Sequence, residues 1–287
     1  ILMDAAGKTL LLYPARRAGT DFVIDENVTT IADYAFAYCQ NLRSLTIGTQ
    51  VEMIGNHAFD AVNDALCLVV QDGSPAQLWA SAHGVRYASE STSFSYRLEG
   101  DKAYITGYTG TLPDVVVPAV IDGYPVYAIE NLRSPILTHV VVSEGIEVIG
   151  DSAFKAYFDY EKGYIRTLVS VSLPQSLKII SDDGFWGQEN LQEITLGSVV
   201  EIGQSAFGSC TMLKQITLPD TLTTIGWRAF ESSGLTSLTI PVNVTSLGDS
   251  FITDCSALTS LYVAEGNPTY EMEDGLLYDI PAKTLRY

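Results

Sequence analysis

Ile202-Gly203-Gln204-Ser205-Ala206-Phe207 is one copy of a six-residue phrase that recurs along this chain. The phrase consists of an aliphatic residue, usually Gly, two variable residues, Ala and Phe. Full copies end at Phe59, Phe154, Phe207 and Phe230, and looser copies end at Phe36, Phe185 and Ile252. The short intervals between these ends are 22 or 23 residues. A fixed period in this range is typical of stacked structural repeats, so the phrase predicts a solenoid.

The rest of each repeat unit predicts one strand followed by a turn. Between Leu213 and Leu218, apolar residues stand at the first, fourth and sixth positions, and the last two share one face of an extended strand. Pro219 ends this strand, and Gly226 with the following Ala-Phe pair predicts a tight helical or 3₁₀ turn. Each unit is too small to bury its apolar face alone, so the units are expected to stack with parallel strands. Equivalent strands are expected at 42–47, 137–142, 168–173, 191–196, 235–240 and 258–263.

This unit resembles the BspA-type leucine-rich repeat, whose consensus has the form C-x-x-L-x-x-L-x-L-P-x-x-L-x-x-I-G-x-x-A-F. The resemblance covers most of residues 22–74 and 129–267, without the Asn ladder of commoner leucine-rich repeats. It implies a leucine-rich repeat solenoid, a right-handed β/α superhelix with a parallel β-sheet on one face and short helical or 3₁₀ turns on the other. It also implies a bacterial protein that is displayed on the cell surface or secreted, with a link to adhesion or host contact.

The repeat period breaks between Phe59 and Phe154, and this break predicts the domain organisation. We expect a first leucine-rich repeat run over residues 1–73 and a second run over residues 131–287. Between them we expect a helix–strand cap and linker over 74–93 and an inserted β-hairpin region over 94–130. In the cap, Pro75 suits the first position of a helix and Gly84 suits the position past its end.

The two ends of the chain carry the same motif at a constant offset of 275 residues. Residues 1–4, Ile-Leu-Met-Asp, match residues 276–279, Leu-Leu-Tyr-Asp, and the Lys-Thr-Leu of 8–10 recurs at 283–285. This match predicts that the chain is a piece, or a processed form, of a longer repeat protein, truncated at both ends. Both interrupted units are expected to expose apolar core, so the purified chain is expected to fray at its ends or to self-associate.

Composition limits the classes of partner. The formal net charge of −18 argues against nucleic acid and anionic lipid, which both need clusters of Lys and Arg. Charged residues make up only 17% of the chain, which argues against disorder. No apolar run reaches the roughly 18 residues of a membrane-spanning helix, so no membrane insertion is expected. Composition leaves the oligomeric state open.

The cysteines follow the repeat. Cys39, Cys210 and Cys255 each stand three residues after the end of a phrase, and Cys67 stands alone. Cys210 and Cys255 are two units apart, about 9–10 Å by strand spacing, beyond the disulfide limit of roughly 7 Å. The pattern predicts small buried thiols.

The residues carry no pattern typical of catalysis or metal binding. The chain has no Gly-x-Ser-x-Gly, no phosphate-binding loop, no His-Glu-x-x-His and no Cys-x-x-Cys, and its three His residues are scattered. We therefore expect a protein that is not an enzyme, without catalytic residues, metal or cofactor. The acidic groups at 182–183 and 271–274 lack the spaced ligands of a calcium loop and are expected to be solvated.

One insertion departs from the repeat and is the first candidate binding site. Phe154 and Phe185 are 31 residues apart, and the additional residues are rich in aromatic side chains. Insertions in solenoids map to loops, and exposed aromatic residues favour binding. The alternative is that these rings fold back over the stack or pack on the hairpin region. The partner-binding candidates here are Tyr157, Phe158, Tyr160 and Tyr164.

The outward face of the predicted strands is the second candidate surface, and its candidates are His139, Glu193, Lys214 and Tyr262. A broad, mixed face of this kind suits a protein or glycan partner better than a small molecule. We therefore predict a non-catalytic extracellular or cell-surface recognition module. The alternative is a structural spacer that displays neighbouring domains of a longer surface protein, and the aromatic insertion counts modestly against it.

Overall fold

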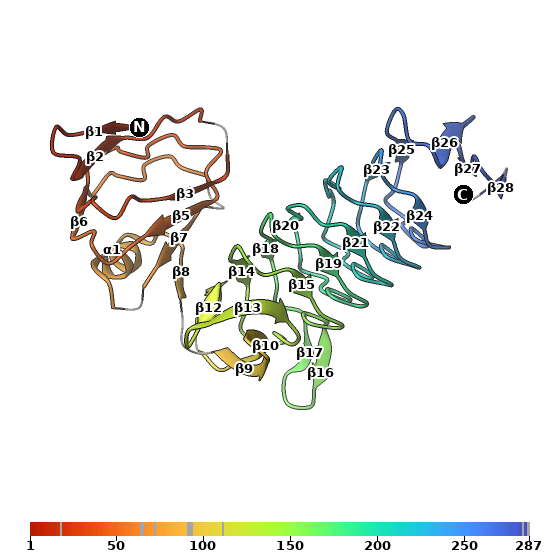
Figure 1. The fold of residues 1–287 in the computed structure, drawn as a ribbon, viewed down its shortest axis with the longest axis horizontal. Helices are drawn as coiled ribbons and strands as arrows, with labels where there is room; N and C mark the ends of the chain where they lie inside the picture. The colour runs from red at the N-terminus through yellow and green to blue at the C-terminus, as the bar shows by residue number, and fades with distance from the viewer. Residues whose placement is uncertain are drawn as a thin grey trace. The chain divides into compact units, whose positions relative to one another are not determined.

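The computed structural model describes residues 1–17, 19–63, 66–71, 73–90, 94–110, 112–282 and 284–285 (Figure 1). The chain forms two compact units, and each is a stack of β-coils. Unit 1 contains residues 1–91 and 114–116, and unit 2 contains residues 92–113 and 117–287.

Unit 1 is built on two sheets. In the smaller sheet, β1 and β2 are antiparallel, and β2 then pairs in parallel with β4, and β4 with β6. All pairs of the larger sheet are parallel. The smaller sheet contains β1 (Leu2–Met3), β2 (Thr9–Leu12), β4 (Thr30–Ile31) and β6 (Met53–Ile54). The larger contains β3 (Asp21–Val23), β5 (Ser44–Ile47), β7 (Cys67–Val70), β8 (Tyr87–Glu90) and β11 (Asp114–Val117).

The longest sheet of unit 2 is a ladder of two-residue strands that starts on a hairpin. The Ile that opens each phrase lies in register with the next, so that Ile149, Ile180, Ile202 and Ile225 form one fully buried row. In order, this sheet contains β9 (Phe94–Glu99), β10 (Lys102–Tyr108), β13 (Tyr124–Ile129), β15 (Val148–Ile149), β19 (Ile179–Ile180), β21 (Glu201–Ile202), β22 (Thr224–Ile225) and β24 (Ser246–Leu247).

The hairpin region lies at the start of this ladder. β9 and β10 are antiparallel, with Gly100 at φ 62° in the turn between them. β12 (Val120–Ile121) pairs with β13 across Asp122 and Gly123, whose φ angles are 51° and 86°. Two successive positive φ angles are typical of the tight turn that matches strand twist. β10 then pairs in parallel with β13, which converts a hairpin into the first rung of the parallel stack.

A second parallel ladder of unit 2 is interrupted at residues 213–218, where the sequence predicts a strand. No strand forms over Leu213–Leu218, although both residues are buried. The preceding coil is one residue shorter, because Leu196 and Val199 are three apart where Leu218 and Leu222 are four apart. This difference lies after Leu218, because the stretches 191–196 and 213–218 themselves have the same length. The ladder contains β14 (His139–Val142), β18 (Ser170–Ser172) and β20 (Glu193–Thr195) before the break, and β23 (Ser237–Ile240) with β25 (Ser260–Val263) after it.

The other face of the stack is a ladder of turns, so the prediction of helical or 3₁₀ turns there was wrong. Alternate N–H groups donate to the next coil, as in the 2.8 Å bonds from Asp183 N to Gln204 O and from Phe185 N to Ala206 O. The N–H groups between them close turns within their own coil, as from Gly184 N to Ser181 O. Neighbouring coils thus satisfy backbone groups that a helical turn would satisfy internally. In the part of the chain described, α1 (Pro75–His83) is the one helix.

This alternation needs left-handed residues at regular places. Ser205 and Ser209 have φ of 50° and 58°, and the next coil repeats this at Arg228 and Ser232 with 53° and 54°. Every residue of a right-handed helix has a negative φ, so the positive φ angles exclude a helix on this face of the stack. Outside Gly, the left-handed conformation costs least for short polar residues such as Asp and Asn. This explains why most variable positions of the phrase hold small or polar residues.

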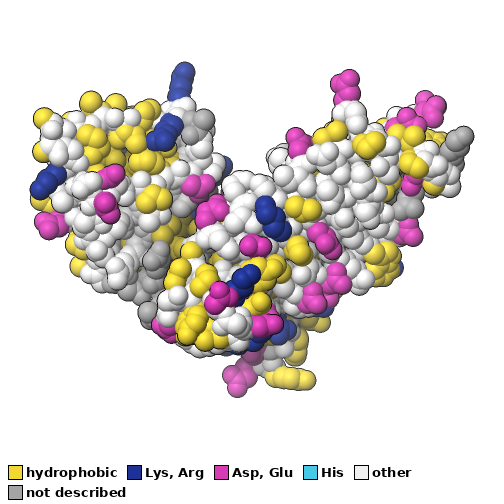
Figure 2. All heavy atoms as spheres, in the orientation of Figure 1, with side chains coloured by type: hydrophobic (Ala, Val, Ile, Leu, Met, Phe, Trp, Pro, Cys, Tyr) yellow, Lys and Arg dark blue, Asp and Glu magenta, His cyan; other side chains and the backbone are white. Residues whose placement is uncertain are grey.

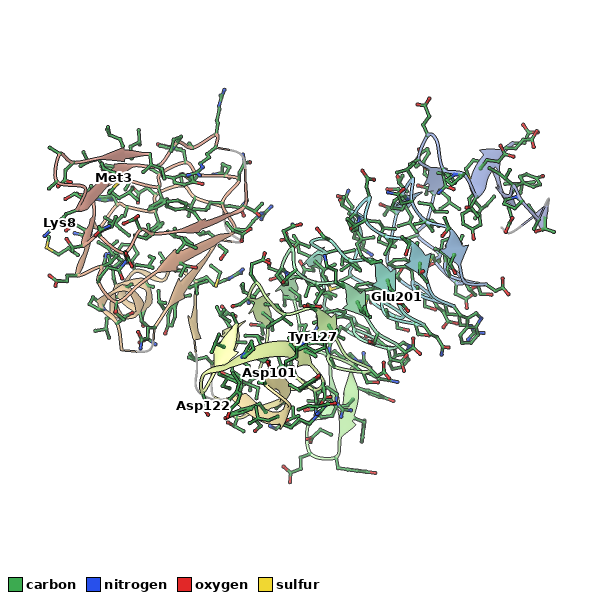
Figure 3. All side chains as sticks on the ribbon, viewed as in Figure 1. Met3, Lys8, Asp101, Asp122, Tyr127 and Glu201 are labelled. Atoms are coloured by element: carbon green, nitrogen blue, oxygen red, sulfur yellow. The ribbon has the colours of Figure 1, made fainter. Side chains whose placement is uncertain are left out.

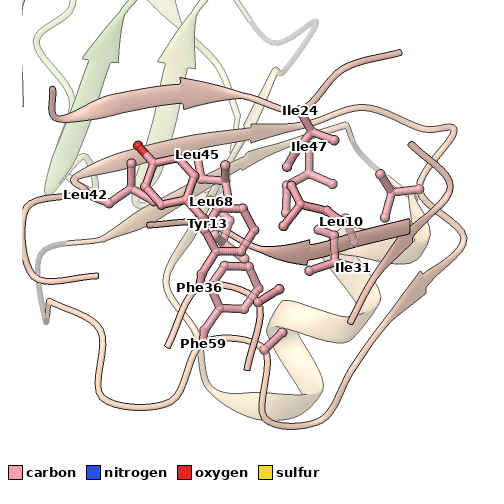
Figure 4. Close-up of a cluster of buried hydrophobic side chains, with 14 of the residues drawn as sticks. Leu10, Tyr13, Ile24, Ile31, Phe36, Leu42, Leu45, Ile47, Phe59 and Leu68 are labelled. Atoms are coloured by element: carbon pink, nitrogen blue, oxygen red, sulfur yellow. The ribbon is translucent and has the colours of Figure 1, made fainter. Parts of the chain in front are cut away.

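The core of each unit is a column of stacked rings. In unit 2, Phe154, Phe185, Phe207 and Phe230 are buried, with successive ring centroids 5.0, 5.4 and 5.6 Å apart and planes within 6°. Unit 1 has Phe36 and Phe59 stacked at 5.3 Å, with Tyr13 before them (Figure 4). Trp79 of α1 ends that column, 5.5 Å from Phe59.

Helix α1 is held at both ends by its capping residues. Ser74 Oγ accepts a hydrogen bond from Gln77 N at 3.2 Å, and Pro75 occupies the first turn. Gly84 takes a left-handed conformation at φ 65° and donates its N–H to Ala80 O. These contacts satisfy backbone groups that a short helix leaves without internal partners.

The four cysteines are free thiols, as predicted, and Cys39, Cys67 and Cys210 are buried while Cys255 is half-buried. Cys210 Sγ donates to Phe185 O at 3.3 Å and Cys255 Sγ donates to Phe230 O at 3.0 Å. The repeat position therefore holds a weak donor that caps a carbonyl of the ring column. Burial raises the pKa of the Cys67 and Cys210 thiols to about 12.

Candidate functional site

The aromatic insertion forms a β-hairpin that projects from the stack of unit 2 (Figure 1). β16 (Tyr157–Asp159) and β17 (Gly163–Ile165) are antiparallel, with Tyr157 opposite Ile165 and Phe158 opposite Tyr164. Asp159 Oδ1 accepts hydrogen bonds from the N–H groups of residues 161 and 162, and Gly163 takes φ 79°. This local chemistry closes the turn, and the two N–H donors hold the pKa of Asp159 below its usual range.

The base of the hairpin is attached to the coils beneath it. Ala156 N donates to Trp186 O at 2.8 Å, and Lys155 Nζ contacts Asp183 Oδ2 at 2.7 Å. On the returning strand, Ile165 is buried, and Arg166 pairs with Glu189. The insertion therefore leaves the stack and re-enters it through packed and hydrogen-bonded residues.

The tip of the hairpin is a cluster of exposed rings. Phe158, Tyr160 and Tyr164 are 53%, 97% and 63% exposed, while Tyr157 is half-buried at the base. Phe158 contacts the other two edge to face, with ring centroids 5.7 Å from Tyr160 and 5.2 Å from Tyr164. In the same orientation, Figure 2 shows hydrophobic side chains at the place of this hairpin. The three tip rings do not fold back over the stack.

Charged groups lie around these rings. The Arg166 guanidinium lies 4.6 Å from the centre of the Tyr164 ring, where its charge meets the negative face of the ring. Its partner Glu189 keeps it there. Glu161 and Lys162, between the two strands, are exposed. The tip thus presents apolar faces with a charged rim, which is the composition of the centre of many interfaces.

The strand-face candidates do not form one cluster. His139 and Glu193 lie in the same outward row, in register with Ser170 between them. Lys214 is exposed outside the strands, where its Nζ donates to Thr211 O at 3.0 Å. Tyr262 is 55% exposed on β25, beside Thr239 in a different row. The structure brings together His139 and Glu193 only.

One group of exposed rings lies outside the surfaces that the sequence indicates. On the turn face of unit 1, Tyr34 stacks on His57 with ring centroids 5.2 Å apart and planes 6° apart. Tyr34 and Tyr38 are 54% and 68% exposed, and both take φ of 61°. They occupy the left-handed positions where most other coils hold Ser or Asp. A Tyr at a repeat position that usually holds a small polar residue is the feature of the sequence that identifies these two side chains.

The acidic groups have structural roles or stay dispersed. Asp182 Oδ1 accepts a hydrogen bond from Gln204 N of the next coil at 2.7 Å. In unit 1, Asp33 Oδ1 accepts the equivalent bond from His57 N of the next coil at 3.1 Å. Over the described ranges, no three His, Cys, Asp or Glu side chains form a group that could hold a metal ion. Nor does any helix within those ranges have the length and apolar character needed to cross a bilayer.

Comparison with known proteins relates the chain to bacterial repeat proteins. A leucine-rich repeat protein of T. pallidum is 30% identical, with 61% of this chain and 70% of that chain covered and a TM-score of 0.44. A leucine-rich cell surface protein of Faecalibacterium prausnitzii A2-165 is 25% identical, with 67% of this chain and 58% of that chain covered and a TM-score of 0.45. A leucine-rich repeat protein of Bacteroides ovatus is 18% identical, with coverage of 88% and 82% and a TM-score of 0.35. No curated protein matches the chain.

The repeat itself gives the more direct assignment. The BspA type leucine-rich repeat region matches in six copies, over residues 17–69 and 133–259. These ranges hold the stacked coils of both units, with their ring columns and turn ladders. Because the match covers more than half of the sequence, the protein belongs to the BspA type leucine-rich repeat family.

Proposed function

We propose that this protein is a non-catalytic recognition module, outside the cell or on its surface, that binds a protein or glycan partner through the β16–β17 hairpin. The observation that carries the proposal is the ring cluster of Phe158, Tyr160 and Tyr164, exposed on a hairpin whose base is fixed. Apolar surface of this kind is exposed to water, and a partner that covers it lowers the free energy.

The geometry of the tip suits recognition more than catalysis. Rigid rings bury large areas with little loss of conformational entropy, and their faces accept sugar rings or apolar side chains. The Asp159 carboxylate is occupied by two backbone N–H groups, so it is a poor candidate for proton transfer. Family membership supports the surface location, and adhesion or host contact is the role that we infer from it.

A structural spacer is the second candidate. The observation that favours it is the outward strand face, where His139, Ser170 and Glu193 form a polar row apart from the aromatic cluster. A solvated β-face of this kind is sufficient for display of neighbouring domains. The spacer role requires no partner for the hairpin rings.

The test is a binding array of extracellular-matrix proteins and glycans probed with the full chain. A triple variant, Phe158→Ser, Tyr160→Ser and Tyr164→Ser, removes the rings and leaves the base residues intact. A matched control, Tyr38→Ser with Tyr124→Ser, removes exposed rings elsewhere. We expect saturable binding that the triple variant loses and the control retains. Binding retained by both variants moves the site to the strand face, and the absence of any binding favours the spacer.

A further inference from the structure

The two ends of the aromatic insertion are joined by one buried amide. Gln188 is 4% exposed, and its Nε2 donates a hydrogen bond to Phe154 O at 2.7 Å. Its Oε1 accepts a hydrogen bond from Leu168 N at 3.4 Å. Phe154 and Leu168 directly precede and follow the insertion at 155–167. A single side chain therefore holds together the two points at which the hairpin leaves and re-enters the stack.

Gln188 departs from the residues that the repeat holds at its position. Three residues after the end of the phrase, other coils have Cys39, Cys210, Ser233 and Cys255. The thiols of Cys210 and Cys255 donate to the carbonyl of the Phe one coil earlier, as the Gln188 amide does. The longer Gln side chain adds the second bond, which closes the base of the insertion. The change of residue and the insertion thus occur together, on neighbouring coils.

Further contacts fix the base of the hairpin on both strands. Asn190 Nδ2 donates to Arg166 O at 2.7 Å. Ala156 lies so close to Gly187 that a Cβ on Gly187 would be 2.9 Å from the Ala156 Cβ. The hairpin is therefore held in one orientation before any partner binds, which lowers the entropic cost of binding.

The ring cluster of Phe158, Tyr160 and Tyr164 lies at a convex tip. In Figure 3 the side chains of β16 and β17 extend away from the coils of the stack. Tyr160 is 97% exposed, and Phe158 meets the other two rings at interplanar angles of 90° and 75°, so the cluster presents no flat platform. Sites for small ligands are concave and surround most of the ligand. A convex tip cannot surround a ligand, but the pocket of a partner can surround the tip.

Charge restricts the kind of partner that surrounds the tip. The two basic groups at the base of the hairpin are already paired, Lys155 with Asp183 and Arg166 with Glu189. The chain as a whole carries a net charge of −18, so its field attracts a basic partner and repels an acidic one. This disfavours acidic glycans and favours a protein with basic residues around an apolar pocket.

We propose that Gln188 is a positioning residue of the recognition hairpin, and that it holds the ring cluster as a preformed projection that enters an apolar, basic-rimmed pocket of a protein partner. The inference rests on the proposed function, in which this hairpin binds the partner. Gln188 is buried at the base and does not touch the partner. It keeps the two ends of the insertion together, so that the rings meet the pocket without first being ordered.

The role of Gln188 is tested on the full chain alone, by hydrogen exchange in the wild type and in Gln188→Cys. The variant restores the residue of the repeat, so it keeps a donor for Phe154 O and loses the acceptor for Leu168 N. We expect the amides of β16 and β17 to exchange about tenfold faster, as for the loss of one hydrogen bond. Cys210→Ala is the matched control, because it removes the donor at the same repeat position one coil later. Unchanged exchange of these amides in Gln188→Cys overturns the positioning role, and so does an equal acceleration in Cys210→Ala.

The pocket is tested on the array of extracellular-matrix proteins and glycans, with affinities then measured for a protein that binds the wild type. Tyr160→Glu and Tyr160→Lys are both expected to weaken binding about 30-fold, because either charge would be buried in an apolar pocket. Gln188→Cys is expected to weaken binding about tenfold, and rising salt is expected to weaken the binding of the wild type. Tyr38→Glu and Tyr38→Lys change an exposed ring of unit 1 and are expected to bind nearly as the wild type.

The outcomes separate the pocket from the recognition function. A loss of binding for only one of the two Tyr160 variants overturns the apolar pocket, and an affinity that does not fall with salt overturns its basic rim. Binding to glycans alone also overturns the protein pocket and leaves the recognition function standing. No binding to any probe overturns the recognition function and the pocket with it, while hydrogen exchange still decides the role of Gln188.

Discussion

Phe185 and Phe207, one repeat apart in the sequence, stack with ring centroids 5.4 Å apart and planes 2° apart. The same backbone ladder positions both rings, because Phe185 N donates to Ala206 O and Phe207 N donates to Ala229 O, each at 2.8 Å. The column and the ladder are therefore one structure. Removing a ring or displacing a coil is therefore expected to disturb the coil before it and the coil after it.

Replacing Phe207 by Ala is expected to lower the free energy of unfolding by about 3–5 kcal/mol, because it opens a cavity between two fully packed rings. The measurement is the urea midpoint of the full chain followed by circular dichroism. Phe158→Ala is the control, since that ring is 53% exposed and its loss leaves no cavity. Equal midpoints for the two variants contradict a continuous ring column.

The Gly of the phrase is expected to be needed most where the previous coil lies closest. A Cβ on Gly226 would lie 2.5 Å from the carbonyl carbon of Gly203, whereas on Gly150 its nearest atom would be Ile129 O at 3.1 Å. Gly226→Ala is therefore expected to cost about 1–3 kcal/mol of stability through displaced backbone. Gly150→Ala is expected to cost less, and thermal unfolding of the two variants compares them. A larger loss for Gly150→Ala would show that close approach is not the reason for this Gly.

The left-handed positions of the turn ladder make a prediction about side-chain branching. Ser209 has φ 58°, and Gly187 holds the equivalent position of the previous coil at φ 74°. Ser209→Val is expected to destabilise the chain by about 1–2 kcal/mol, because a branched side chain disfavours this conformation. Ser209→Gly is expected to be neutral or stabilising. Chemical denaturation measures both, and a Val variant as stable as the Gly variant would argue against the left-handed turn.

The buried thiols predict a loss of stability at alkaline pH. The pKa of Cys210 rises from 9.0 to about 12 on burial, so below about pH 9 the thiol is protonated in both the folded and the unfolded chain. Between these values the unfolded thiol ionises and the folded thiol does not. Stability therefore falls as pH rises, by up to about 1.4 kcal/mol per pH unit for this group.

The check is the urea midpoint at pH 8 and at about pH 10.5, for the wild type and for Cys210→Ala. The variant is expected to lose less stability over this interval. Part of the dependence is expected to remain, because burial also raises the pKa of Cys67 to about 12. An identical loss in both proteins would show that Cys210 does not contribute.

Much of the stack could be predicted from the phrase. Period, the buried Ile row and the buried Phe column follow from residues that recur at fixed spacing, because each unit has one apolar face to cover. The turn face was predicted wrongly as helical or 3₁₀. A short Ala-Phe turn is compatible with either conformation locally, and the hydrogen bonds to the next coil select the alternating one.

The candidate site was also predicted only in part from the sequence. The sequence located the insertion at 155–167 and its aromatic character, since the break in period is visible in the spacing. The spacing does not show whether its rings are covered. The pairing of Phe158 with Tyr164 and the attachment of the base at Lys155 and Arg166 place the rings outside the stack.

The sequence by itself determined the repeat, the residues that face the core and the places where the period breaks, because these depend on local spacing and on which side chains avoid water. Only the tertiary structure decided the turn ladder, the lost strand over 213–218 and the exposed ring cluster. Each of these depends on contacts between coils. In such contacts a backbone group or a ring is either exposed to water or in contact with a residue more than 20 positions away in the sequence.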